Sequence, residues 1–240
     1  MTGRSRGLVR PGRVDRFDRV AACAGIVGGS VMAIGSVATA ITYRGADGER
    51  FSPTNHFVSE LGELAHSDLA RAFNLSVIAG GLCFAVFMSG LAASRPGWLR
   101  VAAGGVGIVA GVAGSFVGVF PMDNIGRHTR AAMTFFNLGW IAVGLASLDF
   151  VVRPDRRFPR PLAIVGLATV AAFIGFLREV RMNTSPDGAL DGPVIRPAVW
   201  AMPTLEWLTI IGIVGWVMLV GAAWLRAGVA GTEIAHGNAA

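Results

Sequence analysis

The residues best suited to chemistry lie in the short polar stretch NHFVSELGE, residues 55–63, which separates two long apolar runs. His56 precedes Glu60 by four residues, and Ser59 lies between them. In a helix, side chains four residues apart share one face and come within hydrogen-bonding distance. We therefore expect a short helix over residues 55–62 in which His56 and Glu60 contact each other.

Two further polar residues follow Pro121, which is expected to end an apolar helix. Asp123 lies in the turn and His128 opens the next helix, so we expect their side chains to meet across the turn. Polar groups close to a bilayer are costly unless they have partners or a function. Asp123 and His128 therefore extend the set of candidate site residues.

An internal repeat adds three more candidates. Residues 73–82, FNLSVIAGGL, match residues 136–145, FNLGWIAVGL, at seven of ten positions. This similarity favours an internal duplication of helical hairpins, as is familiar in membrane folds. It aligns Asn74 with Asn137, and a fainter copy, LEWLTIIG, adds Glu206. The candidate polar cluster therefore comprises His56, Ser59, Glu60, Asn74, Asp123, His128, Asn137 and Glu206.

The elements that position these residues are long and apolar. The chain has 240 residues, of which 53% are hydrophobic and 15% charged, and its mean hydropathy is +0.57. Soluble domains carry about 25% charged residues, and a membrane-spanning helix needs about 20 apolar ones. Six stretches meet that length: 20–43, 71–94, 99–120, 131–152, 161–178 and 204–226.

The predicted fold is therefore an all-α polytopic membrane protein with six transmembrane helices. One membrane domain, residues 20–226, lies between a basic tail, residues 1–19, and a C-terminal tail, residues 227–240. All 21 basic residues are arginines, and six of them precede residue 20. Because arginine-rich short segments stay on the cytoplasmic side, we expect both termini in the cytoplasm and the protein in the plasma membrane.

The net charge of +6 is explained by this topology rather than by nucleic-acid binding, and the expected partners are membrane lipids. The third helix carries Gly107-x3-Gly111 and Gly114-x3-Gly118. Such small-residue pairs let helices approach closely, so this surface predicts either tight packing within the chain or a homo-oligomer.

The two polar motifs closely resemble domain-of-unknown-function family 998, a family of prokaryotic six-helix membrane proteins. The resemblance rests on NHFVSELGE, the following Phe73-Asn74, VGVFPMD at 117–123 and His128. A weaker similarity links Val58-Ser59-Glu60-Leu61-Gly62 to the damage-regulated autophagy modulators and the Sfk-type yeast membrane proteins. The resemblance implies an integral membrane protein tied to lipid or membrane organisation, and it supplies no reaction.

Three functions remain open for the polar cluster. It could brace helix ends as a structural clamp, or it could bind a lipid headgroup or amphiphile beneath the first outer helix as a lid. Anions suit helix N-termini, and Arg71, Arg127 and Arg130 lie near them. The alternative is a membrane-embedded metal-dependent hydrolase that uses His56, Glu60, Asp123 and His128. The sequence itself assigns no catalytic residue, metal or cofactor.

Overall fold

In a computed structural model of the chain, residues 16–45, 47–184 and 196–237 are described. These residues form six long helices and two short 3₁₀ helices. The long helices are α1 (Arg16–Thr42), α2 (Ala70–Ala93), α3 (Trp98–Val119), α4 (Ile125–Val152), α5 (Pro161–Asn183) and α6 (Ala201–Gly237). The 3₁₀ helices are η1 (Val58–Gly62) and η2 (Met122–Asn124).

All six long helices are apolar enough to cross a membrane, which confirms the predicted all-α, six-span fold class. Their bounds differ from the apolar stretches at several helix ends. α1 begins at Arg16, α4 begins at Ile125, α5 continues to Asn183, and α6 continues to Gly237. The physical reason is that charged residues end a hydropathy window without ending the backbone hydrogen bonds of a helix.

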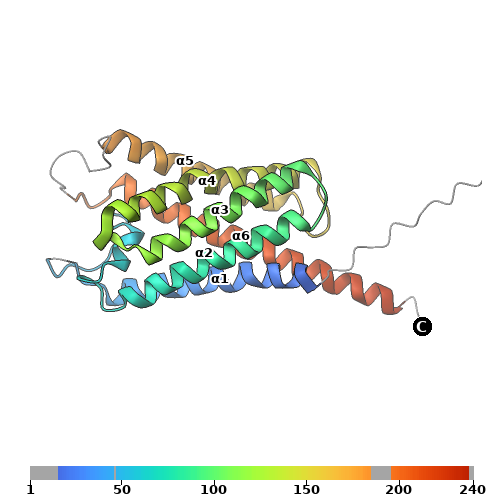
Figure 1. Cartoon of the computed structure of the whole chain (residues 1–240), viewed down its shortest axis with the longest axis horizontal. Helices are drawn as coiled ribbons and strands as arrows, with labels where there is room; N and C mark the ends of the chain where they lie inside the picture. The colour runs from blue at the N-terminus through green and yellow to red at the C-terminus, as the bar shows by residue number, and fades with distance from the viewer. Residues whose placement is uncertain (1–15, 46, 185–195, 238–240) are drawn as a thin grey trace, which may run out of the picture.

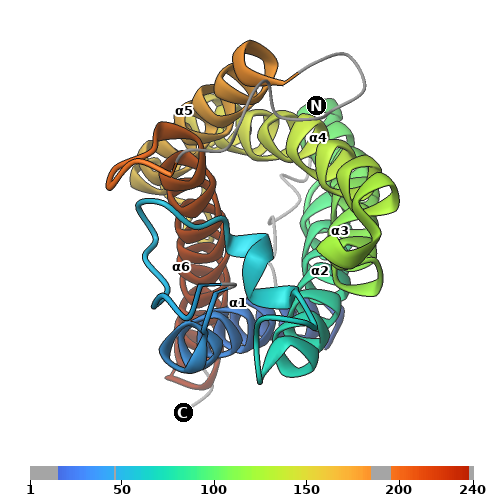
Figure 2. The same cartoon turned by 90° about the vertical axis from the view of Figure 1, so that its left-hand side faces the viewer.

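The six helices form a closed ring in chain order. Each helix packs against its neighbours in the sequence, and α6 packs against α1 to close the ring. Figure 2 shows this ring from one end, with η1 lying across the opening. We call this end the lid end, and the opposite end, where α1 begins and α6 finishes, the tail end (Figure 1). α2, α4 and α6 all begin at the lid end. This shared direction is compatible with the internal duplication of helical hairpins, which stays a prediction.

Proline and glycine set several of the turns between these helices. Pro96 and Gly97 separate α2 from α3, and Pro121 follows the end of α3. Pro161 occupies the first turn of α5, where its missing N–H would have no helical partner in any case. The short turns make antiparallel neighbours of α2 and α3 and of α4 and α5.

Glycines of α3 bring it into close contact with α2. A Cβ atom on Gly111 would lie 2.7 Å from the Gly81 carbonyl oxygen and 2.8 Å from the Ala85 nitrogen. One on Gly118 would lie 2.4 Å from the Asn74 carbonyl oxygen. These glycines therefore serve packing within the chain, which is one of the two uses expected of them.

Aromatic side chains fill the ring toward the tail end. Phe87, Phe150, Phe158, Trp216 and Trp224 are fully buried and contact one another, with ring centroids 5.1–6.3 Å apart. We call these five residues the aromatic floor. Toward the lid end, the helices instead surround a cavity.

Candidate functional site

The lid over the ring is a five-residue 3₁₀ helix, shorter than the helix expected over residues 55–62. Phe57 has extended backbone angles, φ −66° and ψ 149°, so the helix can begin only at Val58. The Phe57 N–H donates to Glu60 Oε1 at 2.8 Å, which caps this short turn. Val58 and Leu61 point into the bundle and are buried. The expected helix over residues 55–62 is therefore corrected to η1, Val58–Gly62.

Glu60 holds the lid in place through contacts with two other segments of the chain. It is 2% exposed, and both of its oxygens lie 2.9–3.0 Å from Arg196 Nη1, on the segment that leads into α6. Tyr43 Oη donates to Glu60 Oε2 at 3.4 Å. Burial, followed by the negative charge of Glu60, raises the pKa of Tyr43, so the phenol stays protonated as a donor. Glu60 thus joins the lid to the end of α1 and the start of α6.

His56 does not contact Glu60, contrary to the expectation from their spacing. Its Nδ1 accepts the Ser52 N–H at 3.2 Å, and its Nε2 faces Glu49 Oε1 at 3.5 Å. The ring is wedged between Tyr43 and Phe51, at centroid distances of 5.5 and 5.2 Å. The extended backbone at Phe57 turns the His56 side chain away from Glu60. His56 therefore holds the loop before the lid.

Three further hydrogen bonds fix the lid to other elements. Asn74 Nδ2 donates to the Gly62 carbonyl at 2.9 Å, and the Leu64 N–H donates to Asp123 Oδ2 at 3.2 Å. From α6, Trp207 Nε1 donates to the His56 carbonyl at 3.2 Å. A Cβ atom on Gly62 would press on the Asn74 side-chain oxygen, so a larger residue would require the Asn74 side chain to shift. Asn74 and Asp123 thus act as anchors of the lid.

Beneath the lid lies a cavity of about 120 Å³ inside the ring. α1, α2, α3, α4 and α6 all line it, and most of its walls are apolar or glycine. Its ionisable and hydroxyl side chains are those of Ser59, His128 and Glu206, all at the lid end. At its deep end, the cavity reaches Gly25 and Val217, beside the aromatic floor. The structure therefore separates the candidate residues into lid anchors and cavity-lining groups.

Glu206 connects the lid and the cavity. The side chain is 7% exposed, and its Oε2 accepts the Val58 N–H of the lid at 2.7 Å. Within the described ranges, its other oxygen accepts no hydrogen bond, and no cationic side chain forms an ion pair with it. Glu206 is thus a buried carboxyl group whose one hydrogen-bonding partner among the described residues is a neutral backbone amide.

His128 presents one ring nitrogen to the same cavity. Its Nδ1 lies 2.9 Å from the Phe120 carbonyl oxygen. A carbonyl only accepts, so Nδ1 carries the proton, and in the neutral ring Nε2 is left as an acceptor. Among the described residues, Nε2 has no hydrogen-bonding partner, and Asp123 binds the lid instead of His128. The expected contact between Asp123 and His128 is therefore absent.

Asn137 does not join the other candidates. It is exposed on α4, and its Nδ2 donates to the Met133 carbonyl of the same helix at 2.7 Å. Across the described part of the chain, no three His, Cys, Asp or Glu side chains converge in a way that could hold a metal ion. His56 and Glu60 serve the lid, whereas His128 faces the cavity, so the four groups of the hydrolase alternative point to different places.

Sequence reasoning missed Arg196 and Tyr43, which hold Glu60. Their signal was weak, because Arg196 is 136 residues away in a proline-rich loop and Tyr43 follows the end of a helix. It also missed an ion-pair network at the tail end. Arg100 and Asp149, each 1% exposed, pair there with Arg100 Nε 2.7 Å from Asp149 Oδ2. Arg153 Nη2 lies 2.8 Å from the other oxygen of Asp149.

This network ties four segments together at the tail end. Arg157 contacts Asp18 of α1 at 3.5 Å and Asp155 at 3.6 Å, and the Arg100 guanidinium lies 4.6 Å from the ring centre of Phe158. Each of these groups has a partner inside the chain. The network is therefore a structural brace, and the cavity is the better candidate for a functional site.

Comparison with protein families gives one match. The model of the family described as "Protein of unknown function (DUF998)" matches residues 26–225, which span all six helices. The chain belongs to this family. The DUF998 match includes the lid, the cavity lining apart from Gly25 and the ion-pair network apart from Asp18. Neither a curated protein nor a solved structure matches the chain significantly, and the similarity to the autophagy modulators and Sfk-type proteins finds no support.

Proposed function

We propose that this integral membrane protein binds a single-chain amphiphile in the cavity, with the polar end of the ligand beneath the lid. The observation that carries the proposal is the one-ended polarity of the cavity. Its long walls are apolar, whereas Ser59, His128 and Glu206 lie together at the lid end. An apolar site with a few convergent polar groups is the usual design of a small-molecule binding site.

The shape of the cavity favours one extended chain. Eleven residues of α6 separate Glu206 from Val217, which corresponds to about 16 Å along the helix axis. A volume of about 120 Å³ spread over that length is narrow. It is comparable to the engineered cavity of about 150 Å³ that binds benzene, so it can enclose part of a single alkyl chain but not a sterol or a pair of acyl chains.

The lid would close over the bound head group. It contacts α1 through Tyr43, α2 through Asn74 and α6 through Glu206 and Trp207. It is also only five residues long and is separate from the transmembrane helices, so it can move without unfolding one of them. This arrangement combines the two expected functions, a structural clamp and a ligand site. The residues that act as the clamp hold the lid, and the lid covers the ligand site.

The orientation and the membrane are part of the same proposal. The arginine-rich loop after α4 lies at the tail end, and α1, which an arginine-rich sequence precedes, begins there. By the positive-inside rule, the tail end faces the cytoplasm, and the lid end faces the outside of the plasma membrane. A ligand would then arrive from the outer leaflet or the outer aqueous phase, and membrane lipids are the expected source.

The test uses a panel of decyl amphiphiles that carry a mid-chain diazirine and neutral, cationic or anionic heads. Each is added to purified protein in lipid nanodiscs and irradiated, and the labelled residues are mapped by mass spectrometry. At least one probe should label cavity residues of α4 and α6. Ala132→Phe, which fills the cavity, should abolish that labelling, whereas Leu167→Phe on the exposed side of α5 should not. Labelling confined to lipid-facing residues for every probe would show that the proposal is wrong.

A further inference from the structure

At the polar end of the cavity, Glu206 and His128 each have hydrogen-bonding capacity that no described residue uses. Glu206 presents a carboxyl oxygen that has no partner among the described residues. His128 presents Nε2 as an acceptor, since its Nδ1 proton is held by the Phe120 carbonyl. The hydroxyl of Ser59, the third polar group, can accept as well as donate. A cationic ligand that carries N–H donors would stabilise Glu206 as a carboxylate and could donate to both Glu206 and His128.

The charges around the cavity favour a cation. In the lid, the buried carboxylate of Glu60 has Arg196 as its counter-ion, whereas Glu206 on α6 has only the Val58 amide among the described residues. A buried carboxylate is strongly stabilised by an opposite charge and costly without one. A cationic head group would supply the charge that Glu206 lacks, and its N–H groups could reach the acceptors beside it.

An anionic head group, which the helix N-termini had suggested, fits less well. Arg71, Arg127 and Arg130 lie near those termini, but all three are exposed and none lines the cavity. Arg127 stacks on Phe120, and Arg130 Nε donates to the Gly126 carbonyl at 3.0 Å. A phosphate or carboxylate in the cavity would meet Glu206 without any arginine to compensate its charge.

We infer that the cavity selects a single-chain primary amine, whose ammonium group donates to Glu206 and His128 beneath the lid. The inference rests on the proposed function and deepens it, because it names the chemistry of the head group. A quaternary ammonium has the charge but no N–H donors, and an alcohol has a donor but no charge. Comparing the amine with a quaternary ammonium and with an alcohol therefore separates the contributions of charge and hydrogen bonding to binding.

The experiment measures competition against the neutral probe, decan-1-ol with a mid-chain diazirine, at the cavity residues in nanodiscs. The competitors are decan-1-amine, decyltrimethylammonium, decan-1-ol and decanoate. The amine should displace the probe at about a tenfold lower concentration than the alcohol, because charge-assisted hydrogen bonds are stronger than neutral ones. Decyltrimethylammonium should fall between them, and decanoate should be the weakest competitor.

Glu206→Gln removes the charge but keeps an amide oxygen that can accept the Val58 N–H, so the lid contact is preserved. In this variant the amine should lose its advantage over the alcohol, so the quantity measured is the ratio of the concentrations at which the two displace the probe. Because all competitors partition into the same nanodiscs, membrane partitioning cancels between variant and wild type. Glu179→Gln on α5, which bonds Asn183 and does not line the cavity, is the matched control and should keep the advantage.

The outcomes separate the two proposals. An amine that competes no better than the alcohol, or an advantage that survives in Glu206→Gln, would overturn the amine inference and leave the binding of amphiphiles intact. If no probe labels the cavity, both proposals fail together. If Glu206→Gln does not fold, the wild-type ranking of amine, quaternary ammonium, alcohol and carboxylate still decides the inference.

Discussion

Two buried glutamates at the lid end, Glu60 and Glu206, differ in how many hydrogen-bond donors and counter-ions surround their side chains. Glu60 is surrounded by donors: Arg196, the Tyr43 hydroxyl and the Phe57 amide all bind it. Glu206 receives one amide hydrogen bond and otherwise faces the cavity. A carboxylate whose oxygens are fully hydrogen-bonded, like that of Glu60, is typical of a structural group. A buried carboxyl group with spare acceptor capacity, like that of Glu206, is typical of a binding site.

Arg196→Ala should loosen the lid, because it leaves the Glu60 carboxylate buried without a counter-ion. We expect a loss of about 1–3 kcal/mol in the stability of the lid, toward the lower end because Arg196 is itself partly exposed. Hydrogen exchange of residues 57–63 measures the effect, with the amides of α3 as an internal reference. In a Glu60→Gln background, the same substitution should cost much less. Equal costs in the two backgrounds would show that Arg196 does not act through Glu60.

Asp149→Ala should be among the most damaging substitutions, because Arg100 would remain fully buried without its carboxylate. Breaking a buried ion pair from one side costs about 3–5 kcal/mol. The apparent Tm in detergent should fall markedly, whereas Asp68→Asn, at an exposed position, should leave it unchanged. The double variant Arg100→Met/Asp149→Leu should recover much of the loss, and a double variant no better than Asp149→Ala would contradict this account.

For individual residues, the sequence predicted which side chains were unusual but not which partners they contact. Glu60 and Glu206 stood out as acids beside apolar runs, and both are buried. Spacing suggested His56 as the partner of Glu60, yet one extended residue, Phe57, reverses the direction of the side chain. Arg196 comes from a distant loop, and only the closed ring brings it to the lid.

Among the elements, the lid is the one whose stability should depend on pH. Burial, followed by the negative charge of Glu60, raises the pKa of Glu63. The folded lid therefore holds a proton that the unfolded segment has already lost. This stabilisation is fully present below the ordinary pKa of a glutamate and is lost as the pH rises through the raised value.

Glu63→Gln should remove this dependence. Relative to wild type, the variant should gain lid stability as the pH rises from about 4 toward neutral, since wild-type Glu63 becomes charged over that range. Hydrogen exchange of the lid amides, corrected for the intrinsic rates, measures the difference. Glu49→Gln is the opposing control, because backbone N–H groups, its own first, and His56 lower the pKa of Glu49. Parallel pH profiles for wild type and Glu63→Gln would argue against the assignment.

The contact between α2 and α3 predicts a large difference between two glycines of one helix. A Cβ at Gly111 would press on the backbone of α2, whereas one at Gly105 meets nothing within 4 Å. Gly111→Ala should therefore destabilise the protein by about 1–3 kcal/mol. Gly105→Ala should be neutral or slightly stabilising, because alanine favours a helix. Thermal unfolding of the two variants tests this, and equal shifts in apparent Tm would show that the close approach is not needed.

For the helices, the sequence was a good guide, because about 20 consecutive apolar residues leave little alternative to a spanning helix. The lid was harder to predict. Its five residues have no periodicity of their own, and their conformation depends on Asn74, Glu206 and Arg196 from other segments. The apolar stretch at 131–152 begins six residues after α4 does, since Arg127, His128 and Arg130 interrupt the apolar pattern but continue the helix.

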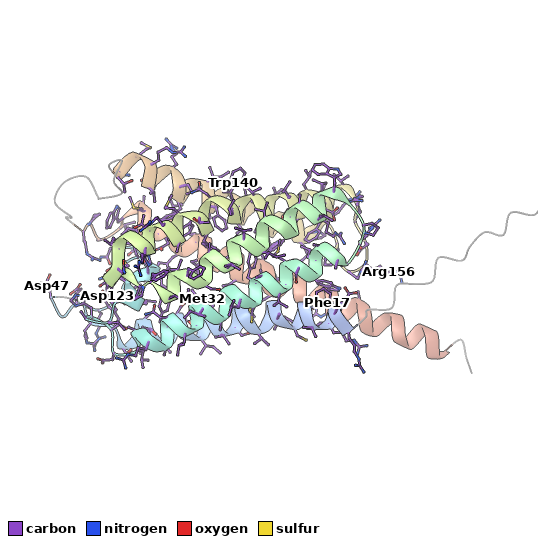
Figure 3. The ribbon with its side chains drawn as sticks, in the orientation of Figure 1. Phe17, Met32, Asp47, Asp123, Trp140 and Arg156 are labelled. Atoms are coloured by element: carbon purple, nitrogen blue, oxygen red, sulfur yellow. The ribbon has the colours of Figure 1, made fainter. Side chains whose placement is uncertain are left out.

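For the whole molecule, the arginine distribution predicts an orientation that can be measured directly. Asp47 lies at the lid end and Arg156 at the tail end, as Figure 3 shows, and both are exposed. In a background without Cys23 and Cys83, Asp47→Cys should react with a membrane-impermeant maleimide in intact cells. Arg156→Cys should react only after the membrane is opened. The opposite pattern would reverse the proposed topology and place the lid in the cytoplasm.

The ring of helices has a consequence for the way the protein is made. Helices emerge from the ribosome in order, so the ring stays open until α6 is synthesised and packs against α1. Arg196, Glu206 and Trp207, which hold the lid, belong to this last part of the chain. A nascent chain that stops after α5 would have an unlatched lid and a gap in the cavity wall. Synthesis of α6 therefore completes both the contacts that hold the lid and the wall of the cavity. A truncated product should be recognised as unfinished and degraded.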